Sequence, residues 1–179
     1  MIVRRVVTAN RADKTSDFDS DGPAPRSVSF DTVPGFEASM IWAAEPDGSK
    51  HAAAEDLTTS VGSWIPSPGG SRLLMVKFPP DAVLASSQAD PATVVQEYLA
   101  KLPGLAESFE PDDPGMHRTE TLDYAVVLEG EIWLELDHGK EVHLKRHDVV
   151  VQTGTRHAWR NRGNSPVTML FVLLGGNSR

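Results

Sequence analysis

The sequence predicts a mainly β protein whose strands form a barrel or a sandwich. Its 179 residues include 14 Gly and 13 Pro, and the segments between them are short and rich in Val, Leu, Ile and Thr. In several of these segments apolar and polar residues alternate, which is the pattern of a half-buried strand. Many short strands separated by turns are typical of barrels and sandwiches. The length fits one domain, or one domain with a long arm.

The C-terminal half contains the clearest series of strands. Between residues 131 and 136, Ile132 and Leu134 share one face while Trp133 and Glu135 share the other, so this strand is half buried. The predicted strands of this half are 124–128, 131–136, 141–144, 149–152, 157–161 and 167–174.

The N-terminal half is less regular. Its strand candidates are 2–8, 28–31, 37–42 and 73–78. Residues 17–26 and 45–61 are rich in Asp, Ser, Pro, Gly and Ala without a sustained period, which predicts arms or long connections. One helix is predicted over 91–102, because Asp90 is a suitable N-cap, Pro91 suits the first helical position and Pro103 with Gly104 ends the helix. Its apolar stripe predicts packing on a sheet.

Composition excludes several classes of protein. Lys and Arg number 17 against 25 Asp and Glu, a net charge of −8, which argues against nucleic acid and anionic membranes as partners. No uncharged apolar run approaches the roughly 20 residues that span a bilayer. The chain has no Cys, so it has no disulfide and no thiolate ligand, which fits a cytoplasmic location. Any metal must be held by His and carboxylates.

Two segments of the sequence concentrate polar residues at regular spacing. The first contains His117, Thr119 and Asp123 and reaches Gly130 after six further residues. The second contains Gly154, followed by His157 and Asn161. On strand parity His117, Thr119, Thr121 and Asp123 share one face, and His157, Trp159 and Asn161 share another.

These two segments resemble the paired motifs of the cupins, G-x5-H-x-H-x3,4-E-x6-G and G-x5-P-x-G-x2-H-x3-N. The resemblance covers about residues 110–174 and is to single-barrel type-2 cupins with a long N-terminal extension. It implies an all-β, cupin-type barrel (a double-stranded β-helix or jelly roll) with one or two short helices. Residues 105–179 are then the barrel core, and residues 1–104 are an extension that packs on the barrel or completes it.

The sequence departs from the cupin motifs at several positions. Thr119 stands where the second His would be, and Asp123 stands where the Glu would be. Gln152 replaces the Pro of the second motif, and its opening Gly is absent, with His147 and Asp148 in that region. On a straight strand, positions 117 and 123 would be roughly 20 Å apart, so one ion can join them only if the chain bends.

The resemblance implies a mononuclear metal site. By position it assigns His117, Asp123 and His157 as ligands of a divalent ion: Fe, Mn, Ni or Zn. Two imidazoles and a carboxylate leave open coordination positions for water or substrate. The residues predicted around the site, or in the wall of its pocket, are Thr119, Thr121, Tyr124, Gln152, Trp159 and Asn161. Met40, Trp42 and Phe78 are further wall candidates.

Two functions of different classes follow. The first is a small-molecule enzyme, with Lewis-acid lyase, dehydratase or isomerase chemistry or with dioxygenase chemistry. The second is a non-catalytic ligand-binding cupin whose metal site has decayed. In either case the expected partner is a small molecule. A homodimer is also expected, with the strand at 2–8 pairing with the sheet edge of the second copy.

Overall fold

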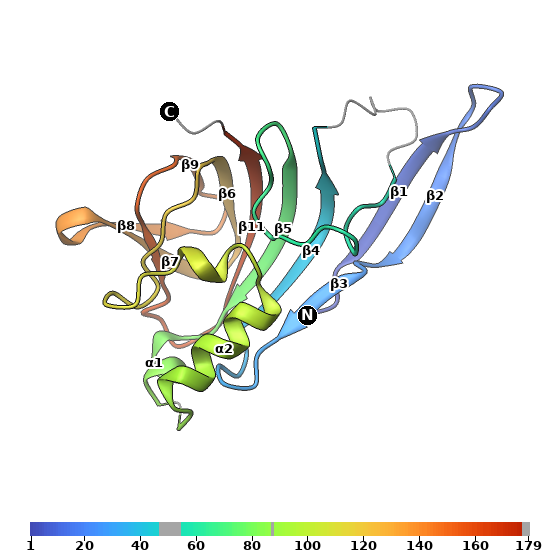
Figure 1. Ribbon diagram of the computed structural model, residues 1–179. Helices are drawn as coiled ribbons and strands as arrows, with labels where there is room; N and C mark the ends of the chain where they lie inside the picture. Colours follow the sequence, from blue (N-terminus) through green and yellow to red (C-terminus); the bar gives the residue numbers. More distant parts are fainter. Residues whose placement is uncertain (47–54, 87, 177–179) are drawn as a thin grey trace.

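The computed structural model describes residues 1–46, 55–86 and 88–176 of the chain. Their strands form three antiparallel sheets, one of six strands, one of three and one of two (Figure 1). The larger two carry the hydrophobic core between them, which is the β-barrel architecture expected of a jelly roll.

The six-stranded sheet combines strands from both halves of the chain. Its order is β3 (Arg26–Ser29), β4 (Glu37–Ala44), β5 (Ser71–Phe78), β11 (Val167–Gly175), β6 (Thr121–Glu129) and β9 (Val149–Thr153). The three-stranded sheet has the order β10 (Ala158–Arg160), β7 (Glu131–Leu136) and β8 (Lys140–Lys145). Because β5 pairs with β11 from Ser71 to Phe78, strands of the N-terminal hundred residues continue the sheet of the C-terminal half.

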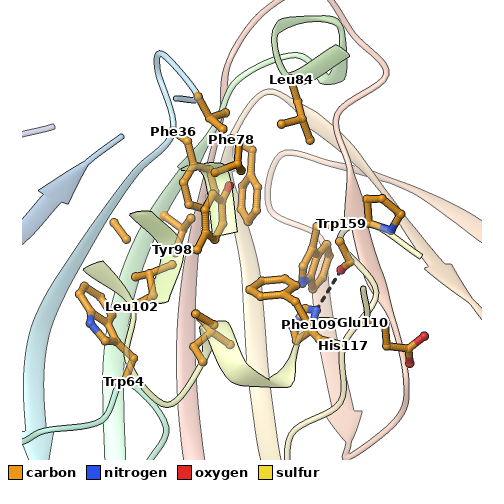
Figure 2. A pocket seen from close by; sticks show the side chains of 18 of the residues that line it. Phe36, Trp64, Phe78, Leu84, Tyr98, Leu102, Phe109, Glu110, His117 and Trp159 are labelled. Carbon is orange, nitrogen blue, oxygen red and sulfur yellow. Dashed lines mark hydrogen bonds between the residues drawn. The ribbon is translucent and has the colours of Figure 1, made fainter. Parts of the chain in front are cut away.

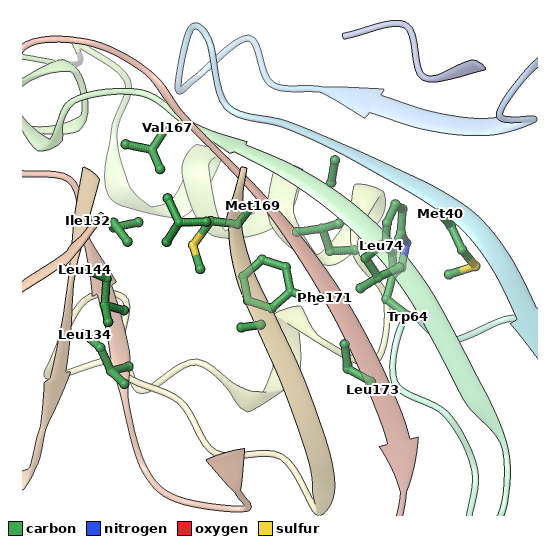
Figure 3. Close-up of a cluster of buried hydrophobic side chains, with 14 of the residues drawn as sticks. Met40, Trp64, Leu74, Ile132, Leu134, Leu144, Val167, Met169, Phe171 and Leu173 are labelled. Carbon is green, nitrogen blue, oxygen red and sulfur yellow. The ribbon is translucent and has the colours of Figure 1, made fainter. Parts of the chain in front are cut away.

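The core lies between these two sheets (Figure 3). Met169 and Phe171 of β11 point into it, and Ile132 of β7 and Leu144 of β8 meet them from the other sheet. In β11, buried and partly buried residues alternate along the strand, as the sequence pattern predicts. Gly130 makes the tight turn between β6 and β7 with φ of 83°, and a Cβ there would lie 3.0 Å from a methyl group of Val167.

The predicted helix is present as α2 (Pro91–Lys101). The Asp90 side chain accepts a hydrogen bond from the Thr93 backbone N–H at 3.0 Å, and Pro91 occupies the first turn, as predicted. A shorter helix, α1 (Asp81–Ala85), brings the number to the one or two short helices expected, although its position was not predicted. Two 3-10 turns, η1 (Ala106–Ser108) and η2 (Asp137–Gly139), were not predicted either. No helix in the described ranges is long and apolar enough to cross a membrane.

One N-terminal segment differs from its prediction. Residues 17–26 were expected to form an arm or a long connection, but Ser16–Pro23 is strand β2, which pairs with β1 (Arg4–Asn10) in a separate ribbon. Both faces of β2 carry polar side chains, so the strand has no apolar period to reveal it. The ribbon extends away from the barrel (Figure 1). Of the other predicted connection, 45–61, residues 47–54 lie outside the described residues.

Candidate functional site

The two motif histidines are neighbours across an antiparallel pair. The His117 N–H donates to the His157 carbonyl at 3.0 Å, and the His157 N–H donates to the His117 carbonyl at 3.0 Å. Residues that exchange both backbone bonds in this way place their side chains on the same face. The two imidazole rings accordingly lie 4.2 Å apart, centroid to centroid. The backbone thus brings together two residues that are 40 positions apart in the sequence.

Both imidazoles are held in one orientation by their local chain. The Nδ1 of His117 lies 3.1 Å from the carbonyl of Gly115, and the Nδ1 of His157 lies 2.9 Å from the carbonyl of Thr155. A carbonyl accepts only from a protonated nitrogen, so Nδ1–H donates in each ring and Nε2 keeps its lone pair. Burial lowers the pKa of both, that of His157 to about 4 with a further contribution from His117. Both rings are therefore neutral at pH 7.

An ion-pair network fixes the loops that carry these rings. Arg156, which precedes His157, donates to Glu110 at 2.7 Å and to Asp113 and Asp137 at 2.9 Å each. Glu110 and Asp113 lie in the loop that leads to His117, so Arg156 joins the two histidine segments a second time. A planar guanidinium with five donors is suited to several carboxylates at once.

Asp123 and Gln152 are partners across β6 and β9, and both are buried, with 6% and 4% of their surface exposed. Asp123 Oδ1 and Gln152 Nε2 have no hydrogen-bond partner within the described part of the chain. Burial raises the pKa of Asp123 to about 6, although a hydrogen bond with Thr121 acts in the opposite direction. An unpartnered buried oxygen and amide are costly, so both atoms are available to a ligand.

A pocket with a volume of about 760 Å³ connects these groups to α2. Figure 2 shows His117, Trp159 and Phe109 on one side of it, and Phe36, Phe78, Tyr98 and Trp64 on the other. Thr119, Asp123, Gln152 and His157 also line the pocket, as does the predicted wall residue Phe78. The residues predicted from the two sequence motifs therefore form one part of this pocket.

Several predicted site residues lie elsewhere. Tyr124 follows Asp123 on β6 and so points to the opposite face, where 40% of its surface is exposed; its assignment to the pocket was wrong. Asn161 is buried, but its amide donates to the carbonyls of Phe78 and Ser165, which makes it part of a turn. Thr121 lies behind the wall, with its hydroxyl 2.8 Å from that of Thr119.

The two N-terminal wall candidates on β4 also lie away from the pocket. Met40 is fully buried in the core. Trp42 lies under the guanidinium of Arg5, 5.5 Å from its ring centroid. A register shift between Met40 and Trp42 breaks the alternation along β4, and the sequence carried no signal for that shift.

The residues fit a divalent ion in part. The paired Nε2 atoms have the orientation of metal-binding imidazoles, whose other nitrogen donates to a backbone carbonyl. Asp123 supplies an orphaned oxygen in the same pocket. Within 1–46, 55–86 and 88–176, however, no three side chains of the His, Asp or Glu type are grouped closely enough to hold an ion. The imidazoles of His117 and His157 lie together. Asp123, the third candidate ligand, lines the same pocket but is not grouped with them.

Sequence reasoning missed the apolar half of the pocket. Phe109 lies 4.8 Å from the His117 ring, and Tyr98 stacks on Phe36 with centroids 5.6 Å apart. The one available signal was the apolar stripe of α2, which predicted packing on a sheet. Trp64 and Phe36 come from loops with no periodic pattern, so their position depends on the tertiary fold.

The fold is a small β-barrel, and its pocket has both polar and apolar walls. Comparison with known proteins identifies the family. Residues 107–173 match the family model described as Cupin domain, and this part of the chain is a cupin domain of the type-2 group. The predicted cupin fold is thereby confirmed.

The curated relatives resemble a limited part of the chain. Phomopsin biosynthesis cluster protein C' of Diaporthe leptostromiformis is 58% identical over 60 residues, which are 33% of this chain and 32% of that protein. The cupin-domain-containing oxidoreductase fogC of Aspergillus ruber is 45% identical over 65 residues, 35% of this chain and 32% of that protein. The aligned part thus spans about a third of the length of these relatives.

The cupin domain of Schizosaccharomyces pombe Cnp3 is a similar solved structure. It is 10% identical to this chain, covers 96% of this chain and 87% of its own, and has a TM-score of 0.47.

Proposed function

We propose that this protein is a metal-dependent cupin enzyme that transforms a small organic molecule in the pocket between α2 and the barrel. The observation that carries the proposal is the imidazole pair, in which both Nδ1–H groups donate to backbone carbonyls and both Nε2 atoms are left for a ligand. The neutral imidazole is the commonest metal ligand among side chains and suits Fe, Ni and Zn, while a carboxylate such as that of Asp123 also suits Mn.

The proposed ion is held by His117 and His157, with Asp123 as the third donor. The orphaned Oδ1 of Asp123 supports this role, because a buried carboxylate without a partner needs a compensating charge. Such an ion, when bound, polarises a carbonyl or hydroxyl oxygen or activates water or dioxygen. The names of relatives such as the cupin-domain-containing oxidoreductases fogC and virC favour redox chemistry over a lyase or isomerase reaction.

The chain's own residues have separate tasks in this proposal. The aromatic wall formed by Phe36, Phe78 and Tyr98 contacts the apolar part of the substrate and excludes water from the pocket. Gln152 donates its free amide N–H to a substrate oxygen and thereby orients it. Arg156 positions the two histidine loops but does not line the pocket.

Elemental analysis tests the metal. We expect near-stoichiometric Fe, Mn, Ni or Zn in the full chain purified without chelator, and none in the His117→Ala/His157→Ala variant. His143→Ala is the matched control, because His143 stacks on Trp133 outside the pocket, and it should retain the metal. Equal metal in the double variant, with its β-rich circular dichroism spectrum unchanged, would refute the assignment.

A second candidate is a ligand-binding cupin without metal. It is favoured by the lack of a three-donor group in the described part of the chain. No bound metal in the parent protein, even after incubation with each ion, would support this candidate and reject the metal enzyme.

We propose further that the protein is a cytoplasmic homodimer joined through its N-terminal ribbon. One edge of β1 pairs with β2, and Ile2, Val6 and Phe18 of the ribbon region are exposed apolar residues. Exposed apolar side chains beside a strand edge are suited to pairing with a second copy. Light scattering of the full chain should give twice its 19.4 kDa mass, and a monomeric mass would contradict this role.

A further inference from the structure

Helix α2 covers the six-stranded sheet but buries none of its own residues. Its apolar side chains Val94, Tyr98 and Leu99 line the pocket. A helix with an apolar stripe normally presses that stripe against a sheet. Here Val94 and Tyr98 contact the core and also line the pocket, whose volume of about 760 Å³ is within the range of pockets that enclose drug-sized molecules.

Apart from the proposed metal ion, the pocket offers no free positive charge to an anion. Arg160 is the one Arg or Lys on its wall in the described part of the chain, and it is bonded to Glu135, Asp113 and the carbonyl of Pro114. The Nδ1 atoms of both histidines are engaged by the carbonyls of Gly115 and Thr155, so the rings present Nε2 to the pocket. A carboxylate or phosphate entering this pocket would lose its hydration without gaining a free cation from the protein.

Three residues that line the pocket carry a buried polar atom without a partner among the described residues: Asp123 (Oδ1) and Gln152 (Nε2), on the paired strands β6 and β9, and Trp64 (Nε1). Gln152 is nine-tenths buried and its Nε2 has no partner among the described residues, so it offers a donor to an oxygen atom. Much of the remaining wall is aromatic and aliphatic, with Phe36, Phe78 and Leu102 among its residues. The part of the pocket formed by Asp123 and Gln152 is therefore polar, and the part formed by α2 and the aromatic residues is mainly apolar.

We propose that the ligand of this pocket is a neutral amphipathic molecule: a hydrocarbon body held beneath α2, with a hydroxyl or carbonyl head at Gln152 and the histidine pair. This inference rests on the proposed function for the location of the site. What it adds is the chemical class of the substrate. It assigns selectivity for the body of the substrate to the N-terminal extension, since α2, Phe36 and Phe78 all precede residue 105.

Calorimetric titration with 1-butanol, 1-hexanol, 1-octanol and octanoate tests this class on the full chain, as purified and after chelator treatment. Each added CH2 should tighten binding about fourfold until the pocket is filled. After chelation, octanoate should bind about tenfold more weakly than 1-octanol, because its charge must be desolvated. Affinity that is independent of chain length, or tighter binding of octanoate after chelation, would overturn the proposal.

Two helix variants locate the hydrocarbon body. Val94→Trp places a large side chain in the pocket and should weaken 1-octanol binding about tenfold, whereas Ala100→Trp lies on the exposed face of the same helix and should leave it unchanged. Equal binding by both variants would contradict the location. If Val94→Trp does not fold, the dependence of affinity on alkanol length in the unmodified protein still tests the proposed ligand class.

Failure of this inference differs from failure of the metal proposal. A chain without metal that binds 1-octanol with the expected length dependence supports the ligand class and rejects the metal. A chain that holds stoichiometric metal at the histidines but binds no alkanol rejects the ligand class alone.

Discussion

At the scale of residues, the central feature is that reciprocal backbone hydrogen bonds pair His117 with His157 and bring their rings into contact. The reciprocal bonds set the distance between the rings, and the carbonyls of Gly115 and Thr155 set their orientation. Both effects depend on main-chain geometry, so substituting the ring should leave the neighbouring chain in place. The site can therefore be tested by side-chain variants.

Thr119 allows a gain-of-binding test. It is 7% exposed, lines the pocket and lies on the same face as His117. Thr119→His places an imidazole where the cupin motif has its second His. We expect metal affinity, measured by competition with a chelator, to rise about tenfold or more, as additional ligands raise affinity. Unchanged affinity would show that position 119 does not face the ion.

Asp123→Asn separates stability from metal binding. In the metal-free protein burial disfavours the charged form of this carboxylate, and a neutral amide of the same shape removes the cost of burying that charge. We expect the free energy of unfolding by urea to rise by about 1–2 kcal/mol. The same variant should lose metal affinity. A less stable metal-free variant would mean that the carboxylate is already satisfied in the folded chain.

The sequence motifs predicted which polar residues belong to the candidate site, but not how these residues are grouped in space. Parity correctly placed His117, Thr119, Thr121 and Asp123 on a buried face. It did not reveal that His117 pairs with His157, because cross-strand pairing joins distant segments. Tyr124 was misplaced although parity itself assigns it to the opposite face from Asp123.

At the scale of elements, α2 is attached to the β3–β4 loop through Glu97. Its carboxylate accepts hydrogen bonds from the backbone N–H groups of Asp31 at 2.8 Å and Thr32 at 2.9 Å, and it is paired with Lys101. Burial favours the neutral acid, but the hydrogen bonds from Lys101, Thr32 and the backbone outweigh it and lower the pKa of Glu97 to about 2. The ionised carboxylate therefore stabilises the position of the helix over the pocket.

The lowered pKa of Glu97 predicts a pH dependence. Since the folded pKa is about 2 against an ordinary 4.5, the contribution is complete above pH 4.5 and is lost as the pH falls from there toward 2. Glu97→Gln should lower the free energy of unfolding by about 1–2 kcal/mol at pH 7 and reduce its loss at acidic pH. Urea unfolding between pH 3 and 7 measures both effects, and parallel curves for the two proteins would contradict the assignment.

Helices and strands whose apolar residues recur at regular spacing were predictable from the sequence, and those without such spacing were not. The capping residue and the proline fixed the start of α2, and the alternation of β7 gave its bounds, Glu131–Leu136, without error. The ribbon strand β2 was missed because its pairing depends on charged contacts, such as that of Arg4 with Asp21 at 2.6 Å, and not on an apolar face.

At the scale of the whole molecule, the cupin domain and the N-terminal strands share one sheet. β5 pairs with β11 along its whole length, and Phe78 of β5 lies 6.3 Å from Phe171 of β11. Without β5, the edge of β11 and part of the core would be exposed to water. The sequence predicted an extension that packs on or completes the barrel, and its boundary at residue 104 stays a prediction.

This shared sheet predicts that a fragment of residues 105–179 does not fold alone. Exposure of the β11 edge and its apolar residues should leave the fragment without a cooperative transition. Circular dichroism with thermal unfolding tests it, and the full chain should show a single transition. A β-rich fragment that unfolds cooperatively would show that the C-terminal residues form an independent domain.

The measurement that tests the central claim most directly is X-ray absorption at the edge of the metal bound to the full chain. Two imidazole ligands, with metal–nitrogen distances of about 2.0–2.1 Å if the ion is zinc, are the expected result. In His157→Ala the bound metal, and with it this signal, should be lost while the β-rich fold is kept. A metal spectrum without imidazole scattering, or one unchanged in that variant, would contradict the proposed site.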